Sequence, residues 1–411
     1  MKDKQTNVLY ISITGMSESL GKSQVLEYLQ DLSIDYGIFL HSFEKDTRIT
    51  VLQDIQNTMN TFGINWTYQV YSNKYGVLST FQQITSSFLK LITIVAKQDI
   101  KIIHARSLIP VLIALLLKMV FKTKVIFDIR GFQTDEKTEV GRIKYKSVLY
   151  FILKFLERFS YQYSDSIVTL TYASKKIIDS MTLPSKVSVI PTCANNRLFK
   201  IVSKSEKAFF KKSLGYNGSD KIIIHAGTVS NWYDFDSELL LMQKIMKKDN
   251  SIHFLILNKG EHNFILEKIH KYSLDISRIK VIEVSFYDMY KYLNIANASL
   301  FIIKPTYSKI ASAPTKFAEN LACGLFSITN NGIGDMDRFF SEYPSVGYSF
   351  NIKELTSSLD CICDTILSKI AFAHENKIEV YMALYNKYLS KEMAIKKYST
   401  LYNSLIFNAK G

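Results

Sequence analysis

The sequence is poor in cysteine, and its few cysteines are not arranged as in a metal site. The four residues form no Cys-x2-Cys pair and have no histidine at ligand spacing: Cys193, Cys323, Cys361 and Cys363. A zinc ribbon or zinc finger is therefore excluded, and we expect no bound metal ion. Thiols that stay reduced are typical of the cytoplasm, so we expect a cytoplasmic protein.

Long apolar runs are also missing. The longest, Leu108 to Phe121, has 14 residues and contains Lys118, whereas a membrane-spanning helix needs about 20 residues. The chain begins Met1-Lys-Asp-Lys and enters a strand-like stretch directly, from which we expect no signal peptide. These features predict a protein that is soluble or lies on a membrane surface.

Acidic residues are outnumbered by basic ones. The chain has 51 lysines and arginines against 37 aspartates and glutamates, a formal net charge of +14. Such a surface attracts phosphate groups, whether in nucleic acid, anionic lipid or a phosphorylated metabolite. Since the chain has no arginine-rich tail and no aromatic ribonucleoprotein motif, we expect no nucleic-acid partner.

A length of 411 residues is too great for one ordinary core and predicts two domains. Short apolar runs alternate with helical stretches, which is typical of an α/β protein with parallel sheets. The predicted strands are Val8–Thr14, Tyr36–Phe43, Trp66–Tyr71, Lys101–His104, Lys124–Phe127, Ser166–Leu170, Val187–Ile190, Lys221–Thr228, Ile252–Leu257, Lys280–Val284 and Leu300–Ile303. The main predicted helices of the first half are Phe81–Lys97, Ile109–Phe121 and Arg142–Tyr163.

The most informative stretch runs from Ile303 to Asp335. Its order predicts a strand, a loop, a helix that begins near Pro314 and ends before Gly324, and a second strand. The loop brings backbone N–H groups to a helix N-terminus beyond the carboxyl end of a strand, where open α/β sheets bind anions. Glu319 could then reach the sugar attached to a bound phosphate, or it could be a solvated residue near the helix dipole.

The segment Pro-Thr-Lys-Phe-Ala-Glu-Asn-Leu-Ala-Cys-Gly-Leu, which begins at Pro314, resembles the nucleotide-binding segment of retaining GT-B glycosyltransferases of family 4. In that family a Glu-x7-Glu pair spans this loop and helix, and the second glutamate binds the donor ribose. Glu319 matches the second glutamate. Ala311 stands eight residues earlier, so the first acid is missing.

The resemblance implies two Rossmann-like, doubly wound domains that face a cleft, with C-terminal helices that cross back to the first domain. Ile190–Phe199 is similar to the family's hinge, and the polar stretch that follows is expected to be a linker. The expected division is an acceptor domain (1–199), a linker (200–219), a donor domain (220–385) and a C-terminal helix on the first domain (386–411).

The resemblance also implies an activity. The protein would move a hexosyl or N-acetylhexosaminyl group, with retention, from a nucleotide-diphosphate sugar to a growing lipid-linked glycan of a bacterial surface polysaccharide. No cofactor is implied. The rival interpretations are a nucleotide-sugar epimerase of the same architecture and a glycosyltransferase-like subunit without catalytic activity.

The donor diphosphate would be bound by groups at two strand ends. The family uses backbone amides at the position of Gly227 and Thr228, and we add the loop residues Ser312, Pro314 and Thr315. The family's Arg and Lys a few residues after the glycine have no counterpart here, because no basic residue occurs before Lys244. The candidate replacements are Lys304, Lys309 and Lys316.

Near the N-terminus, Gly15 to Ser23 is almost a phosphate-binding P-loop. Five residues instead of four separate Gly15 from Gly21, and the extra residue should spoil the wrap of backbone amides. The resembling enzymes have a glycine-containing loop here near the donor phosphate, so Gly15 is a candidate for donor binding.

Two further strand ends carry polar residues, which are the candidate catalytic residues His104, Asp128 and Arg130. Asp128, where the family often has a histidine, could contact the sugar or stabilise positive charge at its anomeric carbon. Arg130 could hold an acceptor phosphate through two hydrogen bonds. The alternative is a buried ion pair of Asp128 with Arg130 or Arg106 that only fixes the loop.

The stretch Arg142–Tyr163 is both basic and aromatic. It could lie among lipid headgroups as a surface helix, or it could pack on the sheet with a basic outer face. The cations of the possible membrane contact are Arg142, Lys144, Lys146, Lys154 and Arg158. Two Asp-x-Asp pairs, at Asp234 and Asp335, are too short a match to indicate a metal site.

Overall fold

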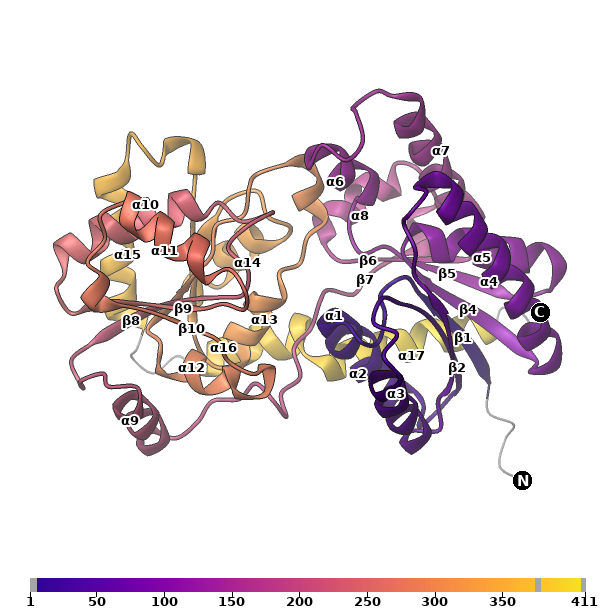
Figure 1. The fold of residues 1–411 in the computed structure, drawn as a ribbon, viewed down its shortest axis with the longest axis horizontal. Coiled ribbons are helices and arrows are strands. Elements are labelled where there is room, and N and C mark those ends of the chain that lie inside the picture. The colour runs from indigo at the N-terminus through magenta and orange to yellow at the C-terminus, as the bar shows by residue number, and fades with distance from the viewer. Residues whose placement is uncertain (1–5, 374–377, 408–411) are drawn as a thin grey trace. The chain divides into compact units, whose positions relative to one another are not determined.

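Two parallel sheets form the centres of two compact units (Figure 1). The computed structural model describes residues 6–373 and 378–407. Unit 1 comprises Met1–Pro191 and Ala394–Gly411, and unit 2 comprises Thr192–Met393. The expectation about a signal peptide concerns residues 1–5, which lie outside the described part, as do residues 408–411 of the predicted C-terminal helix.

Unit 1 has a seven-stranded parallel sheet in the order β3-β2-β1-β4-β5-β6-β7. Its strands are β1 (Asn7–Ser12), β2 (Gly37–Glu44), β3 (Asn65–Val70), β4 (Ile100–Arg106), β5 (Lys124–Asp128), β6 (Ser166–Thr169) and β7 (Val187–Val189). The central strands β1, β4 and β5 are almost wholly buried and carry mainly apolar side chains before their carboxyl ends, as expected when helices cover both faces of a parallel sheet.

The helices of unit 1 follow the strands in alternation. They are α1 (Ser19–Gly21), the π-helical turn η1 (Lys22–Leu26), α2 (Glu27–Leu32), α3 (Ile49–Thr61), α4 (Val77–Lys97), α5 (Leu108–Val120), α6 (Gln133–Glu139), α7 (Val148–Tyr163), α8 (Tyr172–Asp179) and η2 (Pro184–Lys186). Because crossovers are right-handed, connections that run toward β3 and those that run toward β7 lie on opposite faces of the sheet.

Unit 2 has a six-stranded parallel sheet in the order β10-β9-β8-β11-β12-β13. Its strands are β8 (Lys221–Ala226), β9 (Ile252–Leu257), β10 (Ile279–Ile282), β11 (Ala298–Leu300), β12 (Phe326–Asn330) and β13 (Gly347–Phe350). Its helices and helical turns are α9 (Lys204–Ser213), α10 (Phe235–Lys248), α11 (His262–Lys271), η3 (Ile276–Arg278), η4 (Phe286–Asp288), α12 (Met289–Ile295), η5 (Tyr307–Ala311), α13 (Thr315–Ala322), α14 (Met336–Glu342), η6 (Ile352–Glu354), α15 (Leu359–Ala373), α16 (Ile378–Leu384) and η7 (Tyr385–Leu389).

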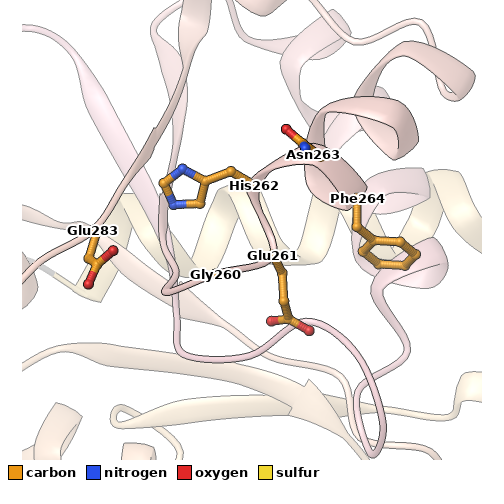
Figure 2. A pocket seen from close by; sticks show the side chains of 6 residues that line it. All are labelled: Gly260, Glu261, His262, Asn263, Phe264 and Glu283. Atoms are coloured by element: carbon orange, nitrogen blue, oxygen red, sulfur yellow. The ribbon is translucent and has the colours of Figure 1, made fainter.

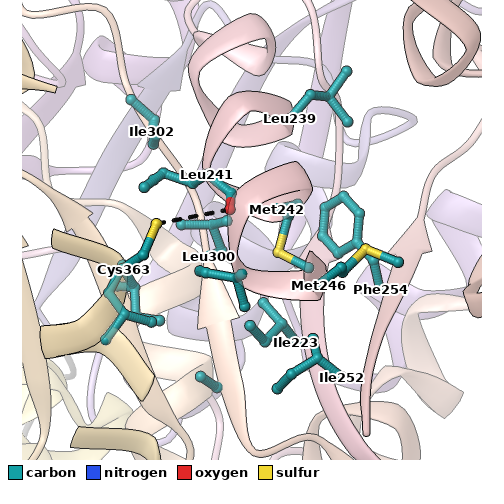
Figure 3. Packing of buried hydrophobic residues seen from close by; sticks show 14 of the residues in the cluster. Ile223, Leu239, Leu241, Met242, Met246, Ile252, Phe254, Leu300, Ile302 and Cys363 are labelled. Carbon is teal, nitrogen blue, oxygen red and sulfur yellow. Dashed lines mark hydrogen bonds between the residues drawn. The ribbon is translucent and has the colours of Figure 1, made fainter. Parts of the chain in front are cut away.

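The core of unit 2 lies between the sheet and the helices α10 and α15. Met242 and Met246 of α10 pack against Phe254 of β9 and neighbouring aliphatic side chains (Figure 3). Cys363 of α15 is buried in the same cluster, where its thiol lies 4.0 Å from the Leu241 carbonyl oxygen. A small apolar side chain with a weak donor suits this place, consistent with a structural rather than a reactive cysteine.

The C-terminal helix α17 (Lys391–Phe407) crosses from unit 2 into unit 1. Tyr398 contacts Tyr28 of α2 edge-on, and Tyr402 contacts Tyr36 in the same way. The Lys397 ammonium donates to the carbonyl of Val189. The helix therefore packs on the first unit, as predicted from the resemblance.

The two parallel sheets confirm the predicted fold class, but some local expectations differ. The predicted helix from Arg142 begins at Val148, because Lys146 has a positive φ of 58° and Ser147 caps the helix through the Tyr150 N–H. The stretch 200–219 contains α9, which starts at a capping box formed by Ser203 and Glu206. The unit boundaries lie at 191/192 and 393/394. Among the described residues, no helix combines the length and apolar character needed to cross a bilayer.

Candidate functional site

The helix α13 begins in the way the sequence predicts. Pro314 is its N-cap, and Gly324, with φ at 68°, follows its last turn. The backbone N–H groups of Thr315 and Lys316 have no hydrogen-bond partner among the described residues, as expected for the first turn of a helix. Ser312, which precedes them, is half-buried like Thr315 and Lys316, and its N–H donates to the Lys309 carbonyl. The helix start thus presents two free donors to an anion.

The loop after β8 lies beside this helix start. Gly227 adopts a φ of 109°, its N–H donates to the Leu257 carbonyl, and its own carbonyl accepts from the Asn258 amide at 3.0 Å. The Val229 N–H donates to Glu261 at 3.0 Å. These bonds leave the Thr228 N–H without a partner among the described residues. One loop amide is therefore available beside the start of α13.

Lys316 connects the helix start to the β8 loop. A Cβ atom added at Gly227 would lie 3.1 Å from Lys316 Cε and 3.3 Å from Nζ. The ammonium also lies 3.7 Å from the centre of the Tyr233 ring, a cation–π contact. A side chain at position 227 would press on the end of Lys316, and the positive φ there also favours glycine, so the two predicted donor-binding residues are in close contact.

Behind Lys316 lies a buried polar pair that holds the loop. His225 Nδ1 is 2.7 Å from Glu238 Oε2, and the other oxygen of Glu238 accepts the Ile302 N–H at 2.9 Å. His225 Nε2 is 3.0 Å from the Thr228 carbonyl oxygen and 3.5 Å from Lys316 Nζ. Because His225 holds the Thr228 carbonyl toward the interior, the His225–Glu238 pair helps to set the conformation of the β8 loop, which carries the Thr228 N–H.

The other two candidate cations reach the same loop. Lys309 is buried, and its ammonium lies 3.4 Å from the centre of the Trp232 ring. Lys304 is exposed and donates to the Asn231 carbonyl at 2.7 Å. The structure therefore brings together all three lysines that could replace the family's Arg and Lys, on the segment Val229–Asp234.

Glu319 lies one turn further along α13 and is 7 % exposed. Its carboxylate has no hydrogen-bond partner among the described residues. Burial raises the pKa of Glu319 to about 7, although nearby Lys316 acts in the opposite direction. The Glu319 oxygens are not among the fully enclosed side-chain atoms that lack a partner, so the carboxylate keeps narrow access through which ligand donors can reach it. Ala311, at the position of the family's first acid, is fully buried.

A cavity of about 490 Å3 opens next to the β8 loop, at the carboxyl ends of β9 and β10 (Figure 2). It is lined by Gly260, Glu261, His262, Asn263, Phe264 and Glu283. Burial alone would raise the pKa of Glu261, but hydrogen bonds from Ser230, Asn258 and the Val229 amide lower it. Hydrogen bonds to the β8 loop thus already engage the Glu261 carboxylate, and Glu283 lies 3.5 Å from the Lys259 ammonium.

In unit 1 the candidate catalytic residues meet at the carboxyl ends of β4 and β5. Asp128 Oδ2 lies 3.4 Å from His104 Nε2 and 3.4 Å from the Tyr398 hydroxyl, while Oδ1 lies 3.5 Å from an Arg130 nitrogen. Burial would raise the pKa of Asp128, but the Arg130 guanidinium and His104 outweigh burial and lower it. Burial lowers the pKa of His104 below its ordinary value, although the Asp128 carboxylate acts in the opposite direction.

The side chains of this cluster differ in access. His104 and Asp128 are buried under Tyr398 and Tyr402 of α17, and His104 Nδ1 lies 2.7 Å from the Tyr402 hydroxyl. The Arg130 side chain is 12 % exposed. The arrangement fits the alternative of a buried ion pair for Asp128, and it leaves Arg130 as the member of the cluster with a path to solvent.

The glycine loop near the N-terminus is closed by a carboxylate of the protein itself. Glu44, buried at the end of β2, accepts the N–H groups of Met16 at 2.7 Å and Ser17 at 3.1 Å. A Cβ atom at Gly15 would lie 2.6 Å from Glu44, and one at Gly21 only 1.9 Å from the Gly15 carbonyl oxygen. Amides that already bind Glu44 cannot wrap a phosphate, so the P-loop interpretation fails for a structural reason. Gly15 contributes close packing here.

The cations of the possible membrane contact are not equivalent. Lys154 is half-buried and bridges Asp135 at 2.9 Å and Glu157 at 2.7 Å, so its charge is used inside unit 1. The other four cations are exposed: Arg142, Lys144, Lys146 and Arg158. Elsewhere in the described ranges, no three histidine, cysteine or acidic side chains come together as a metal site would require.

Sequence reasoning missed several residues of the unit 2 site. His225 could have been found from the sequence, because it is a polar residue that follows three isoleucines and directly precedes Ala226 and Gly227. Glu238, Trp232 and Tyr233 had none, because their roles arise only when α10 and the β8 loop fold against α13.

Comparisons with known proteins find similarity in structure only. No protein-family model matches the chain, and no curated protein matches its sequence. Sucrose-phosphate synthase from Thermosynechococcus elongatus superposes with a TM-score of 0.73 at 14% identity, over 98% of this chain and 100% of that one. A glycosyltransferase from Rickettsia africae reaches 0.70 at 15%, over 98% and 99%. HepE of Anabaena, solved with UDP-glucose, reaches 0.68 at 12%, over 97% and 100%. The chain thus has the GT-B fold.

Proposed function

We propose that this protein is a glycosyltransferase that uses a nucleotide-diphosphate sugar as donor. The observation that carries the proposal is Glu319, a buried carboxylate with no partner among the described residues, one turn from a helix start with free amides. A ribose supplies two neighbouring hydroxyl donors for its oxygens. The HepE structure with UDP-glucose is a neighbour in fold that binds a ligand of this class.

The diphosphate would be held by the N–H groups of Thr228, Thr315 and Lys316 and by the Lys316 ammonium. In the transfer, the bond between the sugar's anomeric carbon and the β-phosphate oxygen breaks, and a bond to an acceptor hydroxyl oxygen forms. The acceptor proton passes to the departing diphosphate, whose charge these groups stabilise. We include retention of the anomeric configuration in the proposal. Because backbone N–H groups of the β8 loop and of α13, together with the Lys316 ammonium, stabilise the negative charge of the diphosphate, the proposed mechanism requires no metal ion.

The nucleobase would enter the cavity lined by Glu261 and Glu283 (Figure 2), which continues from the β8 loop. Unit 1 would bind the acceptor, a lipid-linked glycan of a bacterial surface polysaccharide. Arg130 would hold an acceptor phosphate. Asp128 would position the Arg130 guanidinium through their ion pair, and His104 would orient the Asp128 carboxylate.

The rival functions differ in what they need. An epimerase would act on the donor alone, without an acceptor hydroxyl. A subunit without catalytic activity is suggested by the missing acid at Ala311 and by the absent Arg and Lys. The three lysines around the β8 loop weigh against the second rival, because they restore positive charge at the place of the missing pair.

Thermal unfolding in the presence of UDP, GDP, CMP, ADP and ATP, with and without magnesium, tests the proposal. A ligand that binds only the folded protein raises its Tm by mass action, by an amount that grows with ligand concentration. We expect one nucleoside diphosphate to raise Tm without magnesium, which also identifies the donor base. If none of them shifts Tm at millimolar concentration, the subunit without catalytic activity becomes the better interpretation.

Replacing Lys316 with methionine should lower turnover about 100-fold or more, in line with the loss of one preorganised group at a developing negative charge. Methionine keeps most of the length and packing against Gly227 and Tyr233. The measurement is kcat with the donor whose base the Tm series identifies. Lys247→Met, an exposed lysine in the last turn of α10, is the matched control, and its kcat should stay at the wild-type value. Equal loss in both variants would contradict the role given to Lys316.

A further inference from the structure

Three helices of unit 1 lie side by side on one face of its sheet. The connections through α4, α5 and α7 all lead toward β7, so the right-handed crossover rule puts them on the same face. α5 contacts α4 on one side and α7 on the other. Both α4 and α7 begin at the carboxyl edge of the sheet, because each follows a strand, β3 or β5, and runs back against it (Figure 1).

The outer surfaces of α4 and α7 are unusually apolar. On α7, Phe151 is 58 % exposed and Phe155, one turn later, is 65 % exposed. On α4, Leu78 is 67 % exposed and Phe81, again one turn on, is 66 % exposed. Further exposed apolar side chains extend these rows: Tyr75, Val77, Leu89, Val148 and Ile152. The two rows flank α5 and begin at the same end of the helix layer, so together they mark an interaction surface rather than scattered exposure.

The same helices carry charge of one sign. The sequences of α4 and α5 contain no aspartate or glutamate, and α7 contains one, Glu157. Glu157 is buried and accepts hydrogen bonds from Thr134 and Lys154, so it does not reach the surface. Exposed cations lie on or close to the two helices at this end: Lys74, Lys90, Arg142, Lys144, Lys146 and Arg158.

We propose that the surface formed by α4 and α7 docks on an anionic lipid bilayer, with the two aromatic-containing rows inserted among the headgroups and acyl-chain boundary. Apolar side chains that enter the interface and cations that stay at headgroup level are the two components of such binding. An acidic protein partner would supply the charge but not the broad apolar environment for two helix rows. The surface lies at the edge of the sheet that holds Arg130.

Sedimentation with vesicles tests the proposal on the full chain. We expect binding to phosphatidylcholine vesicles that contain about a third phosphatidylglycerol, and at least tenfold weaker partition to pure phosphatidylcholine at 0.1 M salt. Phe151→Ser with Phe155→Ser should lower partition to the anionic vesicles at least tenfold. Leu78→Ser with Phe81→Ser, on the other helix, should do the same.

The matched control is Ile49→Ser with Phe209→Ser, which removes two equally exposed apolar side chains from α3 and α9. It should leave partition unchanged, and all three variants should keep the wild-type Tm because the replaced side chains are exposed. No vesicle binding by the wild type, or equal binding by the double variants, would overturn the proposal. Self-association that the α7 variant abolishes, without vesicle binding, would assign the surface to contacts between copies. None of these outcomes depends on nucleotide binding, so the surface and the transferase proposal can fail separately.

Discussion

Replacing Glu319 with glutamine should weaken binding of the donor nucleotide about 100-fold at pH 8. A carboxylate accepts two ribose hydroxyls through charge-assisted hydrogen bonds, each worth about 1.5–3 kcal/mol, and a glutamine amide can accept only on its oxygen. The folded protein pays nothing to keep the glutamine neutral, so the variant should be at least as stable as the wild type. Calorimetric titration with the nucleoside diphosphate identified by thermal shift measures the loss.

The pH dependence of the same binding gives a second readout. Because the pKa of Glu319 is about 7 in the free protein, the carboxylate is mostly ionised at pH 8 and mostly protonated at pH 6. Affinity that needs the ionised form should therefore fall about tenfold from pH 8 to pH 6. The phosphate of the ligand titrates in the same range, but it does so equally with Glu319→Gln, so the difference between the two profiles isolates Glu319.

The sign for stability is opposite to the sign for binding. A carboxyl whose pKa is raised on folding, here from an ordinary value of 4.5, costs stability once pH exceeds that value, and the cost levels off above about pH 7. The free protein should thus lose stability between pH 5 and pH 7 relative to Glu319→Gln. Glu267→Gln on the exposed surface of α11 is the control for both measurements. Unchanged donor affinity in Glu319→Gln would remove the observation on which the proposed function rests.

Replacing Asp128 with asparagine should lower the free energy of unfolding by about 3–5 kcal/mol, as expected when one partner of a buried charge cluster is removed. Arg130, 3.5 Å away, and Arg106, 3.8 Å away, would keep their charges in a buried place without a counter-charge. Urea unfolding followed by circular dichroism at pH 7.5 measures the change. At that pH Asp128 is ionised in both folded and unfolded chains, because folding lowers its pKa from an already acidic value.

The control for this variant is Asp179→Asn. Asp179 pairs with Lys175 across one helical turn at 3.0 Å and is partly exposed, so its loss should cost about 0.5 kcal/mol or less. A small effect of Asp128→Asn on stability together with a large fall in turnover would reverse our interpretation, and would favour a direct contact of Asp128 with the sugar.

Much of the architecture was predictable because it depends on local pattern. Short β-branched runs that alternate with helical stretches predicted the strands, and the structure confirms two parallel sheets. Pro314 and Gly324 predicted the two ends of α13, since fixed φ and free φ are properties of those residues themselves. The helix from Arg142 was predicted too long, because the positive φ of Lys146 is imposed by the turn that joins α6 to α7.

The candidate site was only partly predictable. Glu319, Gly227 and Lys316 were named from motif and strand position. The structure places Lys316 against Gly227, and their role in donor binding stays a prediction. The sequence pattern could not show which polar groups already have hydrogen-bond partners within the folded protein. Glu44 closes the glycine loop of unit 1 from a strand 28 residues away, whereas Glu319 is buried without a partner among the described residues.

The sequence by itself therefore determined the class of fold, the ends of α13 and the residue types available for binding an anion, because these follow from backbone propensity and periodicity. Tertiary structure decided which of those groups remain free. His104 and Asp128 were buried by α17, a helix that lies more than 260 residues further along the chain. The backbone N–H groups of Thr228, Thr315 and Lys316 found no partner within the described part of the chain. Hydrogen bonding and burial depend on neighbours brought from distant positions, and those neighbours exist only in the folded chain.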